Sequence, residues 1–243
     1  MEDVRANIVT RMEDIRNYSL TQYNNLSGVY LRDIIRGKAA RLLTKDIDIL
    51  READVADFLA RVSETTLSND DKALLKDKVK GIQGKRKLDI PVNDRFLANY
   101  FTRLVGVHAD IVKKEQDVWS FVSVCNEYLK PSKLMRYDEI NFSIIIEDEL
   151  GKQLDISVLS SGEKQIVSIF AHLYLEEVSE QIVIIDEPEL SLSVPWQKRF
   201  LPDVISSKRC GLLMAVTHSP FIYENELRYN SVDLRKMLKL HVS

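Results

Sequence analysis

The sequence predicts an α/β fold, with a mainly helical region over residues 1–132 and an α/β lobe over residues 133–243. Two observations lead to this prediction. Through much of the first region, apolar residues recur at threes and fours, which is the period of amphipathic helices. In the second region, Ile182–Ile185 is a continuous apolar run, which is typical of a strand buried on both faces of a parallel sheet, and Leu212–Thr217 is expected to be a second buried strand.

The helical region is expected to contain two long helices with shorter ones between them. The first covers residues 1 to about 36 and should stop at Gly37, since glycine is common just past a helix end. Residues 38–88 continue in shorter helices. One of these begins at Ser68–Asp71, an N-cap with an acidic first turn. The second long helix is expected over Arg95–Leu129.

The lobe begins where the apolar period changes from helical to alternating. Ile140–Glu147 is rich in β-branched residues and is predicted to be a strand, and Gln153–Val158 is predicted to be its return strand. This hairpin would lead into Leu159-Ser160-Ser161-Gly162 and a following helix. Pro195 fits the first turn of a further helix over Trp196–Ile205.

Composition indicates an ordinary globular protein. Of the 243 residues, 45% are apolar and 29% are charged, and the net charge of −3 gives no global electrostatic argument for nucleic acid. Cys125 and Cys210 lack metal-ligand spacing and are expected to be reduced thiols. No run of eighteen apolar residues occurs and the N-terminus is acidic, so we expect no membrane span, no secretion signal and a cytoplasmic location.

One local cluster of positive charge stands out against this balance. Six basic residues lie between Lys76 and Lys87, with Asp77 as the one acidic residue among them. The cluster is a candidate for contacting the phosphates of DNA or RNA. A solvated surface segment is the competing interpretation.

Three short segments of the lobe carry residues suited to nucleotide chemistry. Ser160, Ser161 and Gly162 precede a helix, whose free N–H groups and positive dipole end suit a phosphate, although the same residues also form ordinary caps. Asp186 and Glu187 end a strand. One carboxylate can bind Mg²⁺, and the other can orient or deprotonate an attacking water.

His218 completes the set, because it follows the second apolar strand. The carboxyl edge of a parallel sheet is where ligands of α/β proteins bind, so His218 is placed to contact a γ-phosphate or the attacking water. The order of the segments over about sixty residues is more specific than any one of them.

These segments resemble the C-terminal half of an ABC-type ATPase head, of the kind found in SMC proteins, DNA-repair head ATPases and OLD-like, retron- or Septu-associated defence ATPases. Leu159–Glu163 resembles the ABC signature, with Ser161 where transporters usually have Gly. Ile182–Glu187 resembles Walker B with its catalytic Glu, and Ser191 falls in the expected D-loop. Thr217-His218 resembles the switch histidine. The resemblance covers about residues 140–222 and implies a P-loop-type lobe that uses ATP and Mg²⁺.

The resemblance also assigns roles to single residues. Glu187 and His218 would be catalytic and Asp186 would bind the metal. Ser160, Ser161, Gly162, Glu163 and Ser191 would contact the nucleotide.

The sequence departs from this family at the phosphate-binding loop. No G-x-x-x-x-G-K-[ST] motif occurs: Gly81–Arg86 is two residues short and lacks the hydroxyl, and Arg36–Ala39 lacks the first Gly and the hydroxyl. The resemblance therefore implies that Ser160 and Gly162 act in trans, on ATP held by the Walker A lobe of another segment or chain in a head-to-tail dimer.

Three interpretations follow. The chain is an ATPase subunit or fragment completed by a homo-oligomer or a partner with a Walker A motif, or it is a non-catalytic regulatory or scaffold subunit that docks an effector. In the third, the protein is a structural helical protein and the motifs are accidental. The resemblance suggests DNA maintenance or phage defence with a nuclease as partner, although the sequence itself contains no nuclease constellation.

Overall fold

The computed structural model describes residues 1–38, 51–83, 85, 89–178, 180–207 and 209–234, and it divides into two compact units. We call them the sheet unit (Met1–Arg11, Asp117–Tyr137 and Ile144–Ser243) and the helical unit (Met12–Gln116 and Asp138–Ser143). Both long helices contribute residues to both units, so the units do not coincide with the predicted ranges 1–132 and 133–243.

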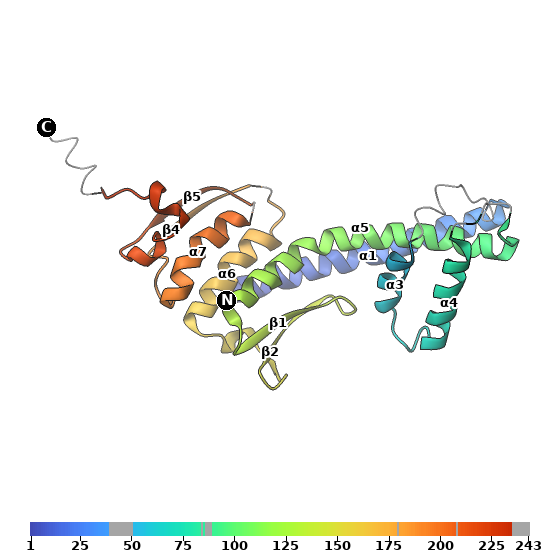
Figure 1. Cartoon of the computed structure of the whole chain (residues 1–243), viewed down its shortest axis with the longest axis horizontal. Helices are drawn as coiled ribbons and strands as arrows, with labels where there is room; N and C mark the ends of the chain where they lie inside the picture. The colour runs from blue at the N-terminus through green and yellow to red at the C-terminus, as the bar shows by residue number, and fades with distance from the viewer. Residues whose placement is uncertain (39–50, 84, 86–88, 179, 208, 235–243) are drawn as a thin grey trace. The chain divides into compact units, whose positions relative to one another are not determined.

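Four helices account for most of the described residues of the helical unit. The long helices are α1 (Glu2–Ile35) and α5 (Val92–Leu129), and α3 (Glu52–Ala60) and α4 (Asn69–Ile82) lie beside them (Figure 1). One cluster of their buried apolar residues is made of Leu26, Val55, Leu59, Val79, Phe101, Leu104 and Val105, and a second contains Ile82, Ile90 and Ala98. The predicted long helices are therefore confirmed, while the predicted helical residues 39–50 lie outside the described residues.

Two local signals set helix ends as expected. At the end of α1, Gly37 has φ +64° and the Lys38 N–H donates to the Asp33 carbonyl at 2.7 Å, which is the Schellman arrangement. Before α4, the Ser68 side chain accepts from the Asp71 N–H, and the Asp71 carboxylate accepts from the Ser68 N–H. This reciprocal capping box confirms the predicted helix start.

A three-stranded sheet has the order β1-β2-β3, from β1 (Lys133–Asp138), β2 (Ser143–Asp148) and β3 (Gln153–Leu154). The antiparallel pairing of β2 with β3 confirms the predicted hairpin. The predicted return strand is shorter than expected, because Ile156–Val158 forms a 3-10 turn in which the Asp155 carboxylate accepts from the Ser157 N–H. Strand β1 was not predicted.

The second sheet pairs β4 (Gln181–Asp186) and β5 (Cys210–Val216) in parallel, with Ile184 opposite Met214. Helices α6 (Ser161–Leu175) and α7 (Val194–Ser206) belong to the same unit, and α7 packs against β5 (Figure 1). Pro195 lies in the first turn of α7, as predicted. Parallel strands and flanking helices are thus present in the lobe.

One prediction about this sheet is wrong. The apolar runs of β4 and β5 were expected to be buried on both faces, but alternate side chains on one face are exposed. We call this the open face: Ile182 (71% exposed), Ile184 (71%), Leu212 (52%), Met214 (54%) and Val216 (45%). An apolar run predicts that both faces of the sheet avoid water, whereas the described residues cover one face and leave the other exposed.

In the described part of the chain, no helix combines the length and the apolar character that crossing a membrane requires.

Candidate functional site

The predicted site residues of β4 and β5 meet at the carboxyl end of the sheet. Asp186 is the last residue of β4 and lies opposite Val216, and the Glu187 N–H donates to the Val216 carbonyl at 2.8 Å. Asp186 is exposed and alternates in phase with Ile182 and Ile184. The open face therefore ends in the carboxylate predicted to bind metal.

Glu187 leaves the strand by an unusual backbone conformation. Its φ is +49°, in the left-handed region that a non-glycine residue adopts at a cost of about 1–3 kcal/mol. The next turn is closed by the Leu190 N–H, which donates to the Glu187 carbonyl at 3.1 Å. The chain therefore changes direction at Glu187, directly after the regular strand that ends at Asp186. Different roles for the two carboxylates require such a difference in backbone conformation.

His218 follows β5, and its backbone is bound by a residue that sequence reasoning missed. The Glu189 carboxylate accepts from the His218 N–H at 2.8 Å and from the Thr217 hydroxyl at 2.6 Å. Burial acts to raise the pKa of Glu189, but these hydrogen bonds outweigh it, so the pKa lies below its usual value. The position of Glu189 directly after Asp-Glu-Pro was the one signal in the sequence that could have pointed to this residue. Its contact with Thr217 depends on the fold.

At the predicted signature, Ser160 and Glu163 form a second capping box. The Ser160 hydroxyl accepts from the Glu163 N–H at 3.3 Å, and the Glu163 carboxylate accepts from the Ser160 N–H at 2.7 Å. The buried Glu163 also pairs with Lys133 of β1, at 2.7 and 2.9 Å. Burial acts to raise the pKa of Glu163, yet the Lys133 and Ser160 hydrogen bonds hold it below its usual value.

These contacts show how α6 begins and which groups the cap uses. The cap takes up the Glu163 N–H, which leaves the first amides of the helix, those of Ser161 and Gly162, to other partners. Ser160 and Ser161 are exposed, whereas Gly162 and Glu163 are buried. Nucleotide contact by Glu163 stays a prediction, since its carboxylate already binds groups of this chain.

Gly162 lies against the predicted D-loop of the same chain. A Cβ added at Gly162 would lie 2.3 Å from the Ser191 carbonyl oxygen and 3.5 Å from the Trp196 ring. Ser191 itself has φ +64°. The absence of a side chain at Gly162 thus allows the loop that contains Ser191 to pack on the start of α6.

Further hydrogen bonds join the loops around this contact. The Gln165 amide group donates to the Pro188 carbonyl at 3.4 Å, and Gln197 of α7 donates to the Leu192 carbonyl at 2.9 Å. The Ser219 hydroxyl donates to the Gln197 side-chain oxygen at 2.6 Å. The structure therefore brings together the start of α6, the turn after β4 and the loop after β5.

The residues at the strand ends fit a magnesium ion that is bound mostly through phosphate and water. No group of three or more His, Cys, Asp or Glu side chains within the described residues forms a protein cage for a metal. Mg²⁺ commonly needs only one or two carboxylates, because it keeps several waters and binds substrate phosphates. An exposed Asp186 at the edge of the sheet meets that requirement.

Among the described elements, neither near-match to a phosphate loop follows a strand: α1 precedes the first, and the second begins within α4. Gly37 forms the C-terminal cap of α1, and Gly81 lies within α4. A P-loop instead connects a strand to the start of a helix, whose N–H groups hold the phosphates. Gly84 and Arg86 of the second near-match are outside the described residues.

The chain matches a protein-family model described as "AAA domain, putative AbiEii toxin, Type IV TA system" over residues 22–224. The chain belongs to this AAA-domain family. The match begins within α1 and ends after His218, so the helical unit falls almost entirely inside the AAA domain. No curated protein matches the chain.

Family membership supports a nucleotide-binding, ATPase-like function for this AAA domain. Domains of this family generally use ATP and Mg²⁺. That cofactor pair agrees with a sheet edge that presents Asp186, Glu187 and His218 from adjacent strand ends.

Proposed function

We propose that this AAA domain contributes half of an ATP-hydrolysing site, in the manner of an ABC-type head, and that another segment or chain provides the phosphate-binding lobe. The observation that carries the proposal is the open face of β4 and β5, which leads directly to Asp186. Within the lobe, the candidate catalytic side chains lie at the end of an apolar surface that the described residues leave uncovered.

Physical chemistry argues that the open face is covered in the active protein. Parallel sheets occur almost always with both faces buried, and a two-stranded sheet has little stability by itself. Each exposed Ile or Met side chain would contribute about 1.5–3 kcal/mol if it were fully buried. A second lobe packed on this face would also bring its own groups to the Asp186 end of the sheet.

Within such a complex, each residue has a defined task. Asp186 would bind Mg²⁺, which neutralises the charge of the phosphates when it is present. Glu187 would orient and deprotonate the attacking water, and His218 would contact the terminal phosphate. Ser160, Ser161, Gly162 and Ser191 would face the nucleotide of a second head across a head-to-tail dimer.

The finer identity belongs to the proposal as well. The order of motifs favours an SMC-like or OLD-like head in DNA maintenance or antiviral defence, with a nuclease as effector. The exposed Lys78, Lys80 and Lys85 are candidates for contacting DNA or RNA.

A non-catalytic regulatory or scaffold subunit is the second candidate. It is favoured by the lack of a G-x-x-x-x-G-K-[ST] motif in the 243 residues. The strained backbone of Glu187 opposes it, since a strained conformation at a strand end is common where a site still performs chemistry.

The test begins with an ATP titration of the isolated chain by calorimetry, in the presence of Mg²⁺. We expect neither measurable binding nor turnover, and tight binding by this chain alone would contradict the proposal of a missing lobe. A chain with a P-loop, encoded beside this one, is then added. Turnover should appear, and Glu187→Gln should trap a nucleotide-bound complex that gel filtration detects.

The matched control is Glu149→Gln, since Glu149 is an exposed glutamate in the turn between β2 and β3. This control should keep full turnover. If the complex forms and never hydrolyses ATP, the scaffold function is supported instead.

A further inference from the structure

We infer that Glu189 is a positioning residue: its carboxylate holds the loop with His218 against the turn that follows Glu187. This inference rests on the proposed ATPase site, because it assigns a residue that sets the relative placement of two candidate catalytic groups. Glu189 itself is not assigned contact with ATP or water.

The carboxylate joins the ends of both strands of the sheet. Its Oε2 accepts from the Thr217 hydroxyl at 2.6 Å, and its Oε1 accepts from the His218 N–H at 2.8 Å. Both distances are typical of hydrogen bonds to an ionised acceptor, which are stronger than bonds between neutral groups. Glu189 is two residues after Glu187, so the same short turn that contains Glu187 binds the backbone of His218.

A second set of bonds fixes the loop from its other side. Besides donating to Glu189, the Thr217 hydroxyl accepts from the Ser219 N–H at 3.0 Å. The Ser219 hydroxyl donates to Gln197, which in turn donates to the Leu192 carbonyl. A closed chain of hydrogen bonds therefore runs from the turn after β4, through α7, to the loop after β5 and back to Glu189.

Glu189 remains an acceptor at neutral pH. The Thr217 hydroxyl and the backbone N–H groups lower the pKa of this carboxyl despite the opposing effect of burial. An acceptor-only group with two oxygens suits the two donors that face it. The amide of Gln keeps the shape but accepts through a single neutral oxygen, so Glu189→Gln would replace the charge-assisted bond to the His218 N–H with a weaker one.

The test on the isolated chain uses ¹⁵N-histidine labelling, because the sequence contains only four histidines. In Glu189→Gln, the His218 amide proton should move upfield and exchange faster with solvent, while the signals of His108 and His172 stay in place. Thr217→Val should produce a similar change, and Thr217→Ser, which keeps the hydroxyl, should restore the native position. Glu149→Gln serves as the control with no expected change.

An unchanged His218 amide in Glu189→Gln would overturn the inference, whatever the chain does with ATP. A merely structural role is also excluded by this readout, since general destabilisation would move the other histidines and lower the melting temperature. Thr217→Ser and Thr217→Val separate the hydroxyl from the volume of the side chain, so the result does not depend on a single variant.

The second measurement is turnover in the complex with the P-loop chain. We expect kcat to fall by about 100-fold in Glu189→Gln, because a displacement near 1 Å has an effect of that order, while KM for ATP changes little. Normal kcat would overturn the inference. If wild-type complex shows no turnover while the His218 signal still depends on Glu189, the proposed ATPase function fails and the positioning of His218 stands.

Discussion

Apolar side chains are enclosed in the helical unit and open to water on one face of the β4–β5 sheet. In the helical unit, Val55, Leu59 and Val79 from α3 and α4 are almost completely buried and share one core with Phe101 of α5. On the open face, Ile182 and Ile184 are each 71% exposed. Similar residue types thus have opposite environments. The contrast concerns the open face alone, because the sheet unit also has fully buried apolar residues, such as Phe170 and Phe200.

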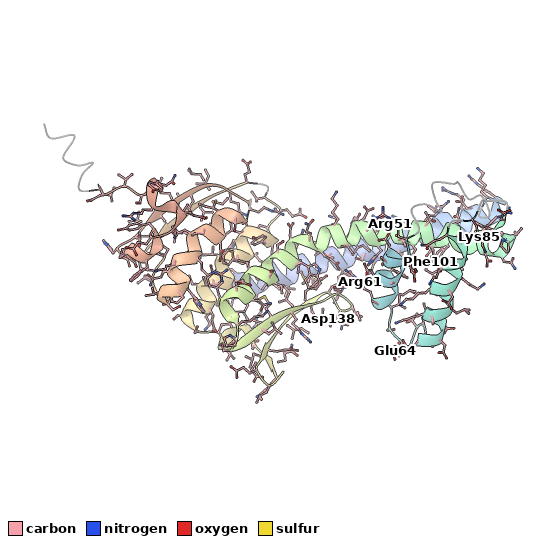
Figure 2. All side chains as sticks on the ribbon, in the orientation of Figure 1. Arg51, Arg61, Glu64, Lys85, Phe101 and Asp138 are labelled. Carbon is pink, nitrogen blue, oxygen red and sulfur yellow. The ribbon has the colours of Figure 1, made fainter. Side chains whose placement is uncertain are left out.

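Polar groups do not follow the same division. In the helical unit, the fully buried Glu115 pairs at 2.7 Å with Arg61, the residue that follows α3 and is labelled in Figure 2. Arg61 also pairs with Glu139 at 2.7 Å. In the sheet unit, the carboxylates of Glu163 and Glu189 also have partners, since Glu163 accepts from Lys133 and Glu189 accepts from the His218 N–H. Incomplete packing in the sheet unit therefore concerns the apolar open face and not the loops that carry the candidate site. The well-bonded loops argue that the open face is a surface for a partner and that the sheet unit is not poorly folded.

Phe101→Ala in the closed core should have the largest effect on stability. Phe101 is buried among α3, α4 and α5, and truncation of such a side chain costs about 3–5 kcal/mol. Urea denaturation followed by circular dichroism measures the loss. Leu74→Ala is the control, because Leu74 on α4 is exposed and should change stability by about 0.5 kcal/mol or less. Equal effects of the two variants would remove the distinction between closed core and surface.

Lys133→Ala should cost about 2–3 kcal/mol at pH 7, because it leaves the buried Glu163 carboxylate without its cation. The lowered pKa of Glu163 stabilises the fold above the ordinary value of 4.5, and this contribution is lost as the pH falls through the lowered pKa. The difference between wild type and variant should therefore shrink on acidification. Denaturation curves at several pH values check this, with the exposed Lys152→Ala as control.

Gly162→Ala should destabilise the sheet unit by about 1–3 kcal/mol, since its Cβ would lie 2.3 Å from the Ser191 carbonyl oxygen. Gly106→Ala on α5 is the matched control, because a Cβ there would meet no atom within 4 Å beyond the neighbouring residues and the backbone of its own helix. That change should stabilise the helix by about 0.5–1 kcal/mol. A stabilising effect at Gly162 would show that the loop with Ser191 does not pack closely on α6.

The double variant Ile184→Ser, Met214→Ser should have the smallest effect on the isolated chain, within about 0.5 kcal/mol, because both side chains already face water. Its effect should appear instead in association with the P-loop chain, measured by calorimetry, and in weaker binding of a hydrophobic dye. A loss of stability comparable with that of Phe101→Ala would mean that this chain itself buries the open face.

Features encoded over a few neighbouring residues were predictable. The Ser68–Asp71 box, the Gly37 cap and the long helical periods all depend on groups less than two turns apart, and the structure has each of them. Strand β1 was missed because Lys133–Asp138 follows a short turn after a helix that ends at Leu129, where pattern alone does not separate a strand from a loop. Its burial, at Met135 and Tyr137, depends on distant residues.

By itself, the sequence determined the class of the lobe and the candidate residues Asp186, Glu187 and His218, because these are local motifs at the ends of apolar runs. Only the tertiary structure decided which contacts hold the loops around them. These are the ion pair of Lys133 with Glu163, the close approach of Gly162 to the Ser191 carbonyl, and the hydrogen bonds of Glu189 with Thr217 and His218. It also decided which face of the sheet is open. Contacts between residues far apart in the chain depend on how strands and helices pack, and a residue pattern does not show which of two apolar faces meets another element.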